Sequence, residues 1–318
     1  MEKLSKIFKK AGGKSLIKQY WKTGVLGFAI IEALLLGFSK KGLEILRLSV
    51  QYKTQAKLKK KYQYVLDRCD KIDYDSLPKE QSNKVWVCWL QGMENAPLVV
   101  QKCHASLHKY LKDKEIILLT SNNIQEYITL PLFIMDKWEK GIISNAHFSD
   151  LIRVELLIRY GGTWIDSTVL CTGSNIPNYI LNSNLFFYQL LKPGRDGHCL
   201  NISNWFISSS TNNKIILILK ELLHEYWIKN NSVSDYYIFH MFVGIICEKY
   251  PEEEQKITKF CNSIPHILQL DLFEPFDEDK FEAIKHMTCF HKLSYKFEEE
   301  LLKKKGTFYD IIINKKQV

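Results

Sequence analysis

One short run constrains the fold of this chain more than any other: residues 149–170 combine an amphipathic stretch, a glycine pair and an apolar stretch. Leu151, Val154 and Ile158 recur at helical spacing, so they predict a helix with one buried face. The β-branched and apolar residues 163–170 predict a buried strand. A helix followed at once by a buried strand is typical of α/β folds.

The same run carries four polar candidates for a site. Ser149 is predicted to cap the helix, which places Asp150 at the positive end of the helix dipole. Asp150 and Arg153 are three residues apart and therefore share a face. Asp166 interrupts the strand, where a carboxylate is costly unless it meets a cation or a donor. Each residue alone also fits a cap, a surface ion pair or a turn, but together they surround one strand end, where open α/β sheets bind ligands.

The two glycines of the run, Gly161 and Gly162, connect the helix to the strand. Gly161 can adopt the left-handed conformation that ends a helix. Gly162 lets another group approach the backbone closely, although a glycine pair by itself indicates only a turn.

Upstream, the pattern predicts a doubly wound sheet. Residues 85–90 and 115–120 form apolar strands, and a helix runs from Pro97 to about residue 111. This order places Trp89 and Gln91 beyond the carboxyl end of the first strand, where a nucleotide would bind. Trp89 has the alternative of being a core aromatic residue.

Downstream, residues 213–230 and 234–250 predict two long helices. Asp235 lies near the start of the second helix. A helix cap is the simpler interpretation of this residue, and a position in a ligand site is the alternative.

The motif Ser149-Asp150, Arg153, Gly161-Gly162 and Asp166 resembles the sugar-donor motif of DXD-type glycosyltransferases with the GT-A fold. Within that superfamily the chain most resembles bacterial capsular polysaccharide synthesis proteins. Residues 85–97 resemble the first strand and nucleotide loop of that family, and residues 291–295 resemble its terminal His-Lys motif. The resemblance implies an α/β, GT-A-like (Rossmann-like) sheet that binds a nucleotide sugar.

The resemblance also implies site residues. The implied catalytic residues are Asp166, Asp150, Arg153 and Asp235, and the implied nucleotide-sugar-binding residues are Trp89, Gln91, Ser149, Asp150, Arg153, Gly161, Gly162, Thr168 and Lys292. A divalent cation, Mn²⁺ or Mg²⁺, is implied as cofactor, held by Asp166 and His291. Thr168 stands where many relatives carry a second Asp, which predicts weaker metal binding because a hydroxyl is a poorer ligand than a carboxylate.

Composition limits the partners. The formal net charge of +9 favours anionic partners, such as nucleoside diphosphates or anionic lipids. The sequence contains no helix-turn-helix, zinc-finger or RNA-recognition signature, so no nucleic-acid partner is expected. The 8 Cys are scattered without a CxxC pair, which indicates reduced thiols and a cytoplasmic location.

The N-terminal part, residues 1–80, is predicted to be a helical appendage to a catalytic domain spanning residues 81–318. Its apolar run, residues 24–38, contains Glu32 and is shorter than the roughly 20 residues that span a bilayer. Two interpretations remain. The appendage either packs on the catalytic domain or, through its lysines, binds the anionic inner face of the cell membrane. The lysines are Lys3, Lys6, Lys9, Lys10, Lys14, Lys18 and Lys22.

Two functional hypotheses follow. The first is a metal-assisted glycosyltransferase that moves a sugar, most simply from a UDP-sugar, to a growing polysaccharide or a lipid-linked glycan acceptor. The second is a non-catalytic, membrane-associated assembly or binding protein of the same fold, which the missing second carboxylate at Thr168 favours.

Overall fold

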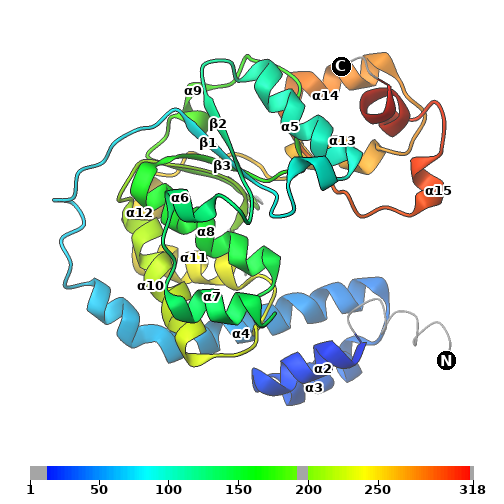
Figure 1. Cartoon of the computed structure of the whole chain (residues 1–318). Coiled ribbons are helices and arrows are strands. Elements are labelled where there is room, and N and C mark those ends of the chain that lie inside the picture. The colour runs from blue at the N-terminus through cyan, green and yellow to red at the C-terminus, as the bar shows by residue number, and fades with distance from the viewer. Residues whose placement is uncertain (1–12, 192–199, 316–318) are drawn as a thin grey trace.

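A five-stranded sheet forms the centre of the molecule in the computed structural model, which describes residues 13–191 and 200–315 (Figure 1). Its strands are β1 (Lys84–Cys88), β2 (Glu115–Leu119), β3 (Gly162–Ile165), β5 (Leu185–Gln189) and β6 (Ile202–Ser209), in the order β2-β1-β3-β6-β5. β1 pairs in parallel with β2 and β3, whereas β6 is antiparallel to both of its neighbours. All strands except β6 therefore run in one direction, and the predicted α/β class is confirmed.

Helices cover both faces of the sheet, as the alternation of β1 requires. Trp86 belongs to the core shared with helices α8 (Asn145–Tyr160), α10 (Lys214–Lys229) and α11 (Ile238–Lys249), which lie below the sheet in Figure 1. Val85 and Val87 face the core on the opposite side of the sheet. Leu107 of helix α5 (Leu98–Tyr110) and Leu111, the residue after this helix, belong to the same core. The remaining short elements are η1 (Met93–Asn95), α6 (Ile124–Tyr127), α7 (Leu132–Glu139), α9 (Asn178–Leu181), α12 (Pro251–Gln255), η2 (Ile264–His266), α13 (Ile267–Asp271), α14 (Glu278–Met287), α15 (Glu299–Leu302) and η3 (Asp310–Asn314).

The predicted continuous strand over residues 163–170 is wrong. β3 ends at Ile165, the chain turns, and β4 (Val169–Cys171) pairs instead with β7 (Phe290–Lys292) in a separate two-stranded sheet. The backbone N–H of Val169 donates to the carbonyl of Asp166 at 3.0 Å, which closes the turn. Asp166 therefore lies in a turn at the end of β3 and does not interrupt a strand.

The predicted cap of helix α8 is also wrong. The helix begins at Asn145, and the hydroxyl of Ser144, its N-cap, accepts the backbone N–H of His147. Phe148 is fully buried and stacks on Trp138 at a centroid distance of 4.0 Å, so the apolar face extends upstream of Leu151. Ser149 lies inside the helix as a result.

Both glycines of the pair, Gly161 and Gly162, have positive φ angles. Gly161 ends helix α8 with φ of 63°, as predicted, and its N–H bonds to the carbonyl of Leu157 at 3.0 Å. Gly162 has φ of 90°, and a Cβ there would lie 2.3 Å from the carbonyl oxygen of Lys84 in the neighbouring strand. Only glycine fits this close approach of β1 and β3 without a shift.

The N-terminal helices divide into two parts. Helix α4 (Lys40–Cys69) departs from helical geometry at Tyr62, and its second half enters the main core through Leu58 and Val65. Helices α2 (Gly13–Lys22) and α3 (Leu26–Leu36) instead share a small separate cluster with the first half of α4. Lys3, Lys6, Lys9 and Lys10 lie outside the described residues. The division into 1–80 and 81–318 stays a prediction.

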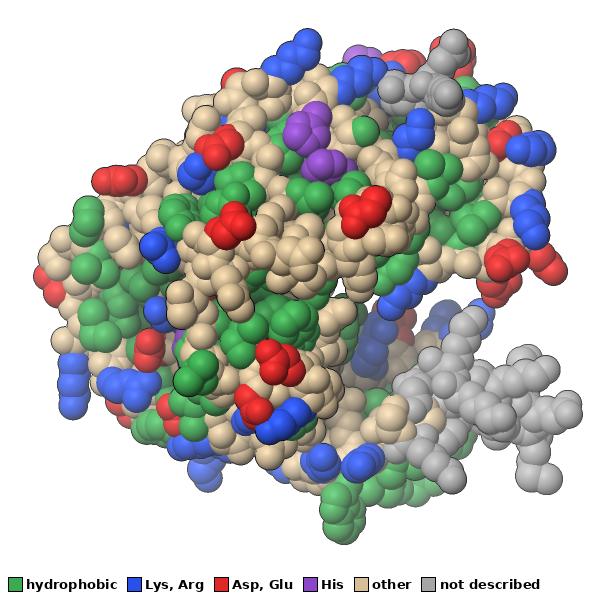
Figure 2. All heavy atoms as spheres, viewed as in Figure 1, with side chains coloured by type: hydrophobic (Ala, Val, Ile, Leu, Met, Phe, Trp, Pro, Cys, Tyr) green, Lys and Arg blue, Asp and Glu red, His purple; other side chains and the backbone are tan. Residues whose placement is uncertain are grey.

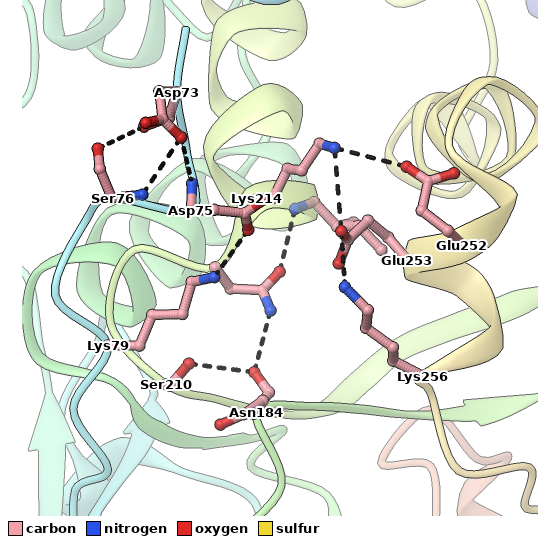
Figure 3. Close-up of polar contacts among 12 residues, drawn as sticks. Asp73, Asp75, Ser76, Lys79, Asn184, Ser210, Lys214, Glu252, Glu253 and Lys256 are labelled. Atoms are coloured by element: carbon pink, nitrogen blue, oxygen red, sulfur yellow. Dashed lines mark hydrogen bonds and ion pairs between the residues drawn. The ribbon is translucent and has the colours of Figure 1, made fainter.

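Residues 70–83 contain neither helix nor strand. Asp73 accepts the backbone N–H groups of Asp75 and Ser76 there (Figure 3). In the same region, the Nζ of Lys214 lies 3.5 Å from Glu252 and 3.9 Å from Glu253, which ties helix α10 to α12.

The seven cysteines within the described ranges are all free thiols.

Candidate functional site

A polar pocket of about 320 Å³ lies where the carboxyl ends of β1 and β3 meet the amino-terminal part of β6. Parallel strands place their carboxyl ends at one edge of a sheet, and open α/β sheets bind ligands there. The pocket is lined by Cys88, Trp89, Leu90, Gln91, Asn145, Ala146, His147, Ser149, Asp150, Arg153, Trp164, Asp166, Ser167, Thr168, Asn204, Tyr236, Lys292, Tyr295 and Lys296. The motif residues of helix α8 and of the β3 turn thus share one site.

Arg153 is a buried cation that lines the pocket. Its side chain is 4% exposed, and the guanidinium carbon lies 4.6 Å from the centroid of the Trp164 ring. It donates to the backbone carbonyl and the hydroxyl of Ser149, and to the carbonyl of Asn204. It also lies 3.4 Å from Asp150 and 3.6 Å from Asp166. Most of its donors are occupied by the protein, so Arg153 holds both carboxylates in place.

Asp150 is nearly buried against this guanidinium. Its Oδ1 accepts the side-chain amide of Asn204 at 2.8 Å, and its Oδ2 lies 3.5 Å from Nδ1 of His147. The Nδ1 of His147 is buried and has no hydrogen-bond partner among the described residues. A carboxylate accepts several hydrogen bonds, so Asp150 retains capacity for a ligand hydroxyl.

Asp166 lies between an indole and an ammonium. Its Oδ1 accepts Nε1–H of Trp164 at 3.0 Å, and its Oδ2 accepts the Nζ of Lys292 at 3.0 Å. Lys292 also donates to the hydroxyl of Thr168 at 2.6 Å. Burial raises the pKa of Asp166, but the charges of Lys292 and Arg153, together with the hydrogen bonds from Trp164 and Lys292, outweigh burial and hold this pKa below its ordinary value. The carboxyl group is therefore ionised at neutral pH.

An aromatic wall closes the pocket on the side of β1. Trp89 follows β1, and its ring meets the ring of Tyr295 edge-on at 5.3 Å. The Nε1 of Trp89 is buried without a hydrogen-bond partner, which leaves a donor available beside the cavity. Gln91 is exposed at the rim. The predicted positions of Trp89 and Gln91 beyond the first strand are confirmed.

Three predicted site residues lie elsewhere. Gly161 and Gly162 are at the opposite end of β3 from Asp166, against the backbone of Ser209 and Lys84, so they do not line the pocket. His291 is fully buried, and its Nε2 bonds to the hydroxyl of Thr172 at 2.8 Å. Burial lowers the pKa of His291 to about 4. Successive strand residues point to opposite faces, so Lys292 reaches the pocket and His291 does not.

Asp235 does not line the pocket either. It borders a neighbouring groove formed with helices α2 and α4, and Tyr236 lines both the groove and the pocket. The carboxylate of Asp235 accepts the backbone N–H of Tyr237 at 2.8 Å, just before helix α11. Burial raises its pKa. The N-cap of helix α11 is Tyr237, so the predicted cap at Asp235 is wrong, and Asp235 instead closes a turn just before the helix.

Sequence reasoning missed Asn204, Lys296 and Tyr236. Asn204 follows Ser203 at the start of β6, before the apolar residues Trp205, Phe206 and Ile207, so it gave no local signal of its own. Lys296 follows Lys292 by four residues, close to the quoted His-Lys motif. Tyr236 gave no signal beyond its position next to Asp235.

The donor set does not suit the predicted cation. A divalent cation needs several oxygen ligands with free lone pairs. Both carboxylates already face cationic partners, and Lys292 bridges the oxygens of Asp166 and Thr168 that a metal would need. No group of three His, Cys, Asp or Glu side chains placed to hold a metal occurs among residues 13–191 and 200–315. Mn²⁺ or Mg²⁺ binding therefore stays a prediction that these residues do not favour.

Known proteins resemble the chain in parts. "Glycosyltransferase afumC" of Aspergillus fumigatus (strain CBS 144.89 / FGSC A1163 / CEA10) is 26% identical over 106 residues, which cover 30% of this chain and 27% of that protein. The chain thus spans about a quarter of that relative's length. The solved structure titled "PaToxG Glycosyltransferase" aligns with 85% of this chain and 98% of its own, at 14% identity and a TM-score of 0.37. Residues 38–312 match the model of the family described as capsular polysaccharide synthesis protein, so the chain belongs to that family.

Proposed function

We propose that this chain is a glycosyltransferase that moves a sugar from a nucleoside-diphosphate donor, a UDP-sugar in the first instance, to a growing surface polysaccharide or a lipid-linked glycan. The observation that carries the proposal is the pocket itself. It combines an aromatic wall, two ordered carboxylates and three cationic side chains at the ligand-binding edge of the sheet. Family membership and the name of the fungal relative support it.

Each part of the pocket suits one part of such a donor. Trp89 offers a face on which a nucleobase can stack. Asp150, fixed by Asn204 and Arg153, accepts hydrogen bonds from ribose or sugar hydroxyls. Lys292 and Lys296 supply positive charge for the diphosphate.

The transfer breaks the bond between the anomeric carbon and the diphosphate oxygen and forms a bond to an acceptor hydroxyl. The diphosphate leaves with the bonding electron pair, and the hydroxyl proton passes to a base. Cations placed where this negative charge develops lower the barrier. The ionised Asp166 holds the ammonium of Lys292 in that place.

A screen of nucleotide sugars for slow hydrolysis tests the proposal, with and without manganese. We expect one donor to be hydrolysed, with Asp150→Asn reducing the rate about a hundredfold because the hydroxyl contacts weaken. Leu132→Ser, on the exposed surface of helix α7, serves as the matched control. Hydrolysis of no donor, combined with tight binding of a glycan, would favour the non-catalytic alternative.

We also propose that the N-terminal helices bind an anionic membrane from the cytoplasmic side. Helix α3 exposes Ile30, Ile31, Leu34 and Leu35, the last two at 73% and 78%. Hydrophobic side chains gather at the lower edge of the molecule in Figure 2, where α2 and α3 lie in Figure 1. Lys18 and Lys22 of helix α2, and Lys40 and Lys41 of helix α4, are exposed on the helices that precede and follow α3 in the chain. An apolar face combined with lysines is typical of interfacial helices. No helix in the described part of the chain is long and apolar enough to span a bilayer.

Co-sedimentation with phosphatidylcholine vesicles, with and without phosphatidylserine, tests this second proposal. We expect the parent to bind the anionic vesicles and the double variant Leu34→Ser, Leu35→Ser to lose most of that binding. Leu132→Ser is again the control, because Leu132 is 88% exposed and belongs to helix α7, outside the N-terminal helices. Equal binding by all three proteins would show that the α3 surface is not the anchor.

A further inference from the structure

Lys292 occupies the position in the pocket that a bound cation would need. β7 pairs with β4 so that Lys292 lies opposite Val169, one residue after Thr168. Its Nζ lies 3.0 Å from Oδ2 of Asp166 and 2.6 Å from Oγ1 of Thr168. An ammonium group has three donors, so these two bonds leave one for a ligand. The side chain is 19% exposed, which keeps that donor accessible from the pocket.

The charges around Lys292 match a diphosphate. The charged groups lining the pocket are three cations, Arg153, Lys292 and Lys296, and two carboxylates, Asp150 and Asp166. Arg153 is committed to both carboxylates and to Ser149 and Asn204. Lys292 and Lys296 therefore remain as the cations with capacity for an added anion.

The same geometry opposes a divalent cation. Oδ1 of Asp166 already accepts Trp164, and Oδ2 accepts Lys292. A metal on Asp166 would have to displace the ammonium and then remain close to it, with a single neutral hydroxyl, Thr168, in place of a second carboxylate. Two positive charges at short distance repel strongly in a partly buried pocket.

We propose that Lys292, held by Asp166 and Thr168, provides the positive charge for the donor diphosphate, and that nucleotide binding does not require a divalent cation. This inference rests on the proposed function, because it assumes a nucleoside-diphosphate ligand in this pocket. Asp166 is then a positioning residue for the ammonium. Thr168 is the second positioning residue, because its hydroxyl accepts a hydrogen bond from the ammonium of Lys292.

Calorimetric titration of UDP and GDP into the full chain tests the proposal, once in EDTA and once in manganese. We expect the preferred nucleotide to bind with the same affinity in both. Lys292→Met should weaken binding in EDTA by about tenfold or more, the usual loss for a charged hydrogen bond. Lys292→Arg should retain most of the affinity. Lys280→Met is the matched control, because Lys280 pairs with Asp271 on the surface of helix α14.

A second variant makes the test independent of how well Lys292→Met folds. The double variant Thr168→Asp, Lys292→Met carries two carboxylates and no ammonium, so we expect manganese to tighten its nucleotide binding about tenfold or more. Binding by the parent only in manganese would overturn the inference and leave the proposed function intact. Parental affinity of Lys292→Met in EDTA would overturn it as well. Binding of neither nucleotide under either condition would overturn both.

Discussion

Replacing Gly162 with alanine should cost the protein about 2–5 kcal/mol of unfolding free energy. The new Cβ would lie 2.3 Å from the backbone carbonyl oxygen of Lys84, so β1 and β3 must separate by about 1 Å to restore ordinary contact. Overpacking of this kind costs about 1–3 kcal/mol, and the positive φ of 90° adds about 1–2 kcal/mol for any residue with a Cβ. The sum is a large part of the roughly 5–15 kcal/mol that holds a domain together.

Urea unfolding at pH 7 measures this loss, and Gly141→Ala separates its two parts. Gly141 has φ of 67° with nothing within 4 Å of an added Cβ, so its variant should show only the backbone cost of about 1–2 kcal/mol. The nucleotide affinity of the folded Gly162→Ala protein should equal that of the parent, because Gly162 lies at the other end of β3 from the pocket. Equal destabilisation by both substitutions would refute the steric argument, and a selective loss of nucleotide affinity would return Gly162 to the site.

Three further substitutions have definite outcomes. Asp166→Asn should cost about 1–2 kcal/mol, because the partly exposed carboxylate loses its charge partners. The folded-state pKa of Asp166 lies below 3.8, so urea unfolding should show this deficit constant above about pH 5, shrinking below pH 4 and lost only as pH falls through the folded-state pKa. His291→Gln should flatten the stability curve between pH 6.5 and 4.5, because the parent, with a folded-state pKa of about 4 against 6.5 when unfolded, loses up to about 3 kcal/mol as pH falls; an unchanged slope would contradict the burial of a neutral imidazole. Thr168→Asp alone should not tighten manganese binding by calorimetry, because the new carboxylate meets Lys292 first.

Local patterns predicted the elements whose formation depends on neighbouring residues. The helix over residues 213–230 was predicted to within a residue, because Asn213 caps it with two backbone contacts and the apolar stripe is continuous. The first two strands and the helix between them were predicted as well. These signals placed Trp89 at the ligand edge of the sheet without knowledge of any contact.

Long-range strand pairing determined features that the local sequence pattern did not predict. The apolar run over residues 163–170 has the composition of one strand, but β3 pairs with β1 and β6, whereas β4 pairs with β7 more than 100 residues later. The break between them creates the turn that carries Asp166. Composition contains no information about that change of partner, since both halves are equally apolar.

Register had the same effect on the His-Lys pair. His291 and Lys292 are adjacent, so one must face the pocket and the other the core, and either choice is compatible with local pattern. The pairing of Leu170 with His291 fixes the choice. A fully buried imidazole next to Thr172 satisfies one ring nitrogen, whereas a buried ammonium would need an anionic partner that only the pocket provides.

Thr168 and Lys292 are best understood as one feature. Considered alone in the sequence, Thr168 resembles a damaged metal site, with one carboxylate where two are expected. Considered with its contact, it is the hydroxyl partner of an ammonium that also pairs with Asp166. A second carboxylate at position 168 would add negative charge beside the proposed diphosphate site. On the proposed function, Thr168 therefore suits an anion-binding pocket, and the missing Asp no longer argues for the non-catalytic alternative.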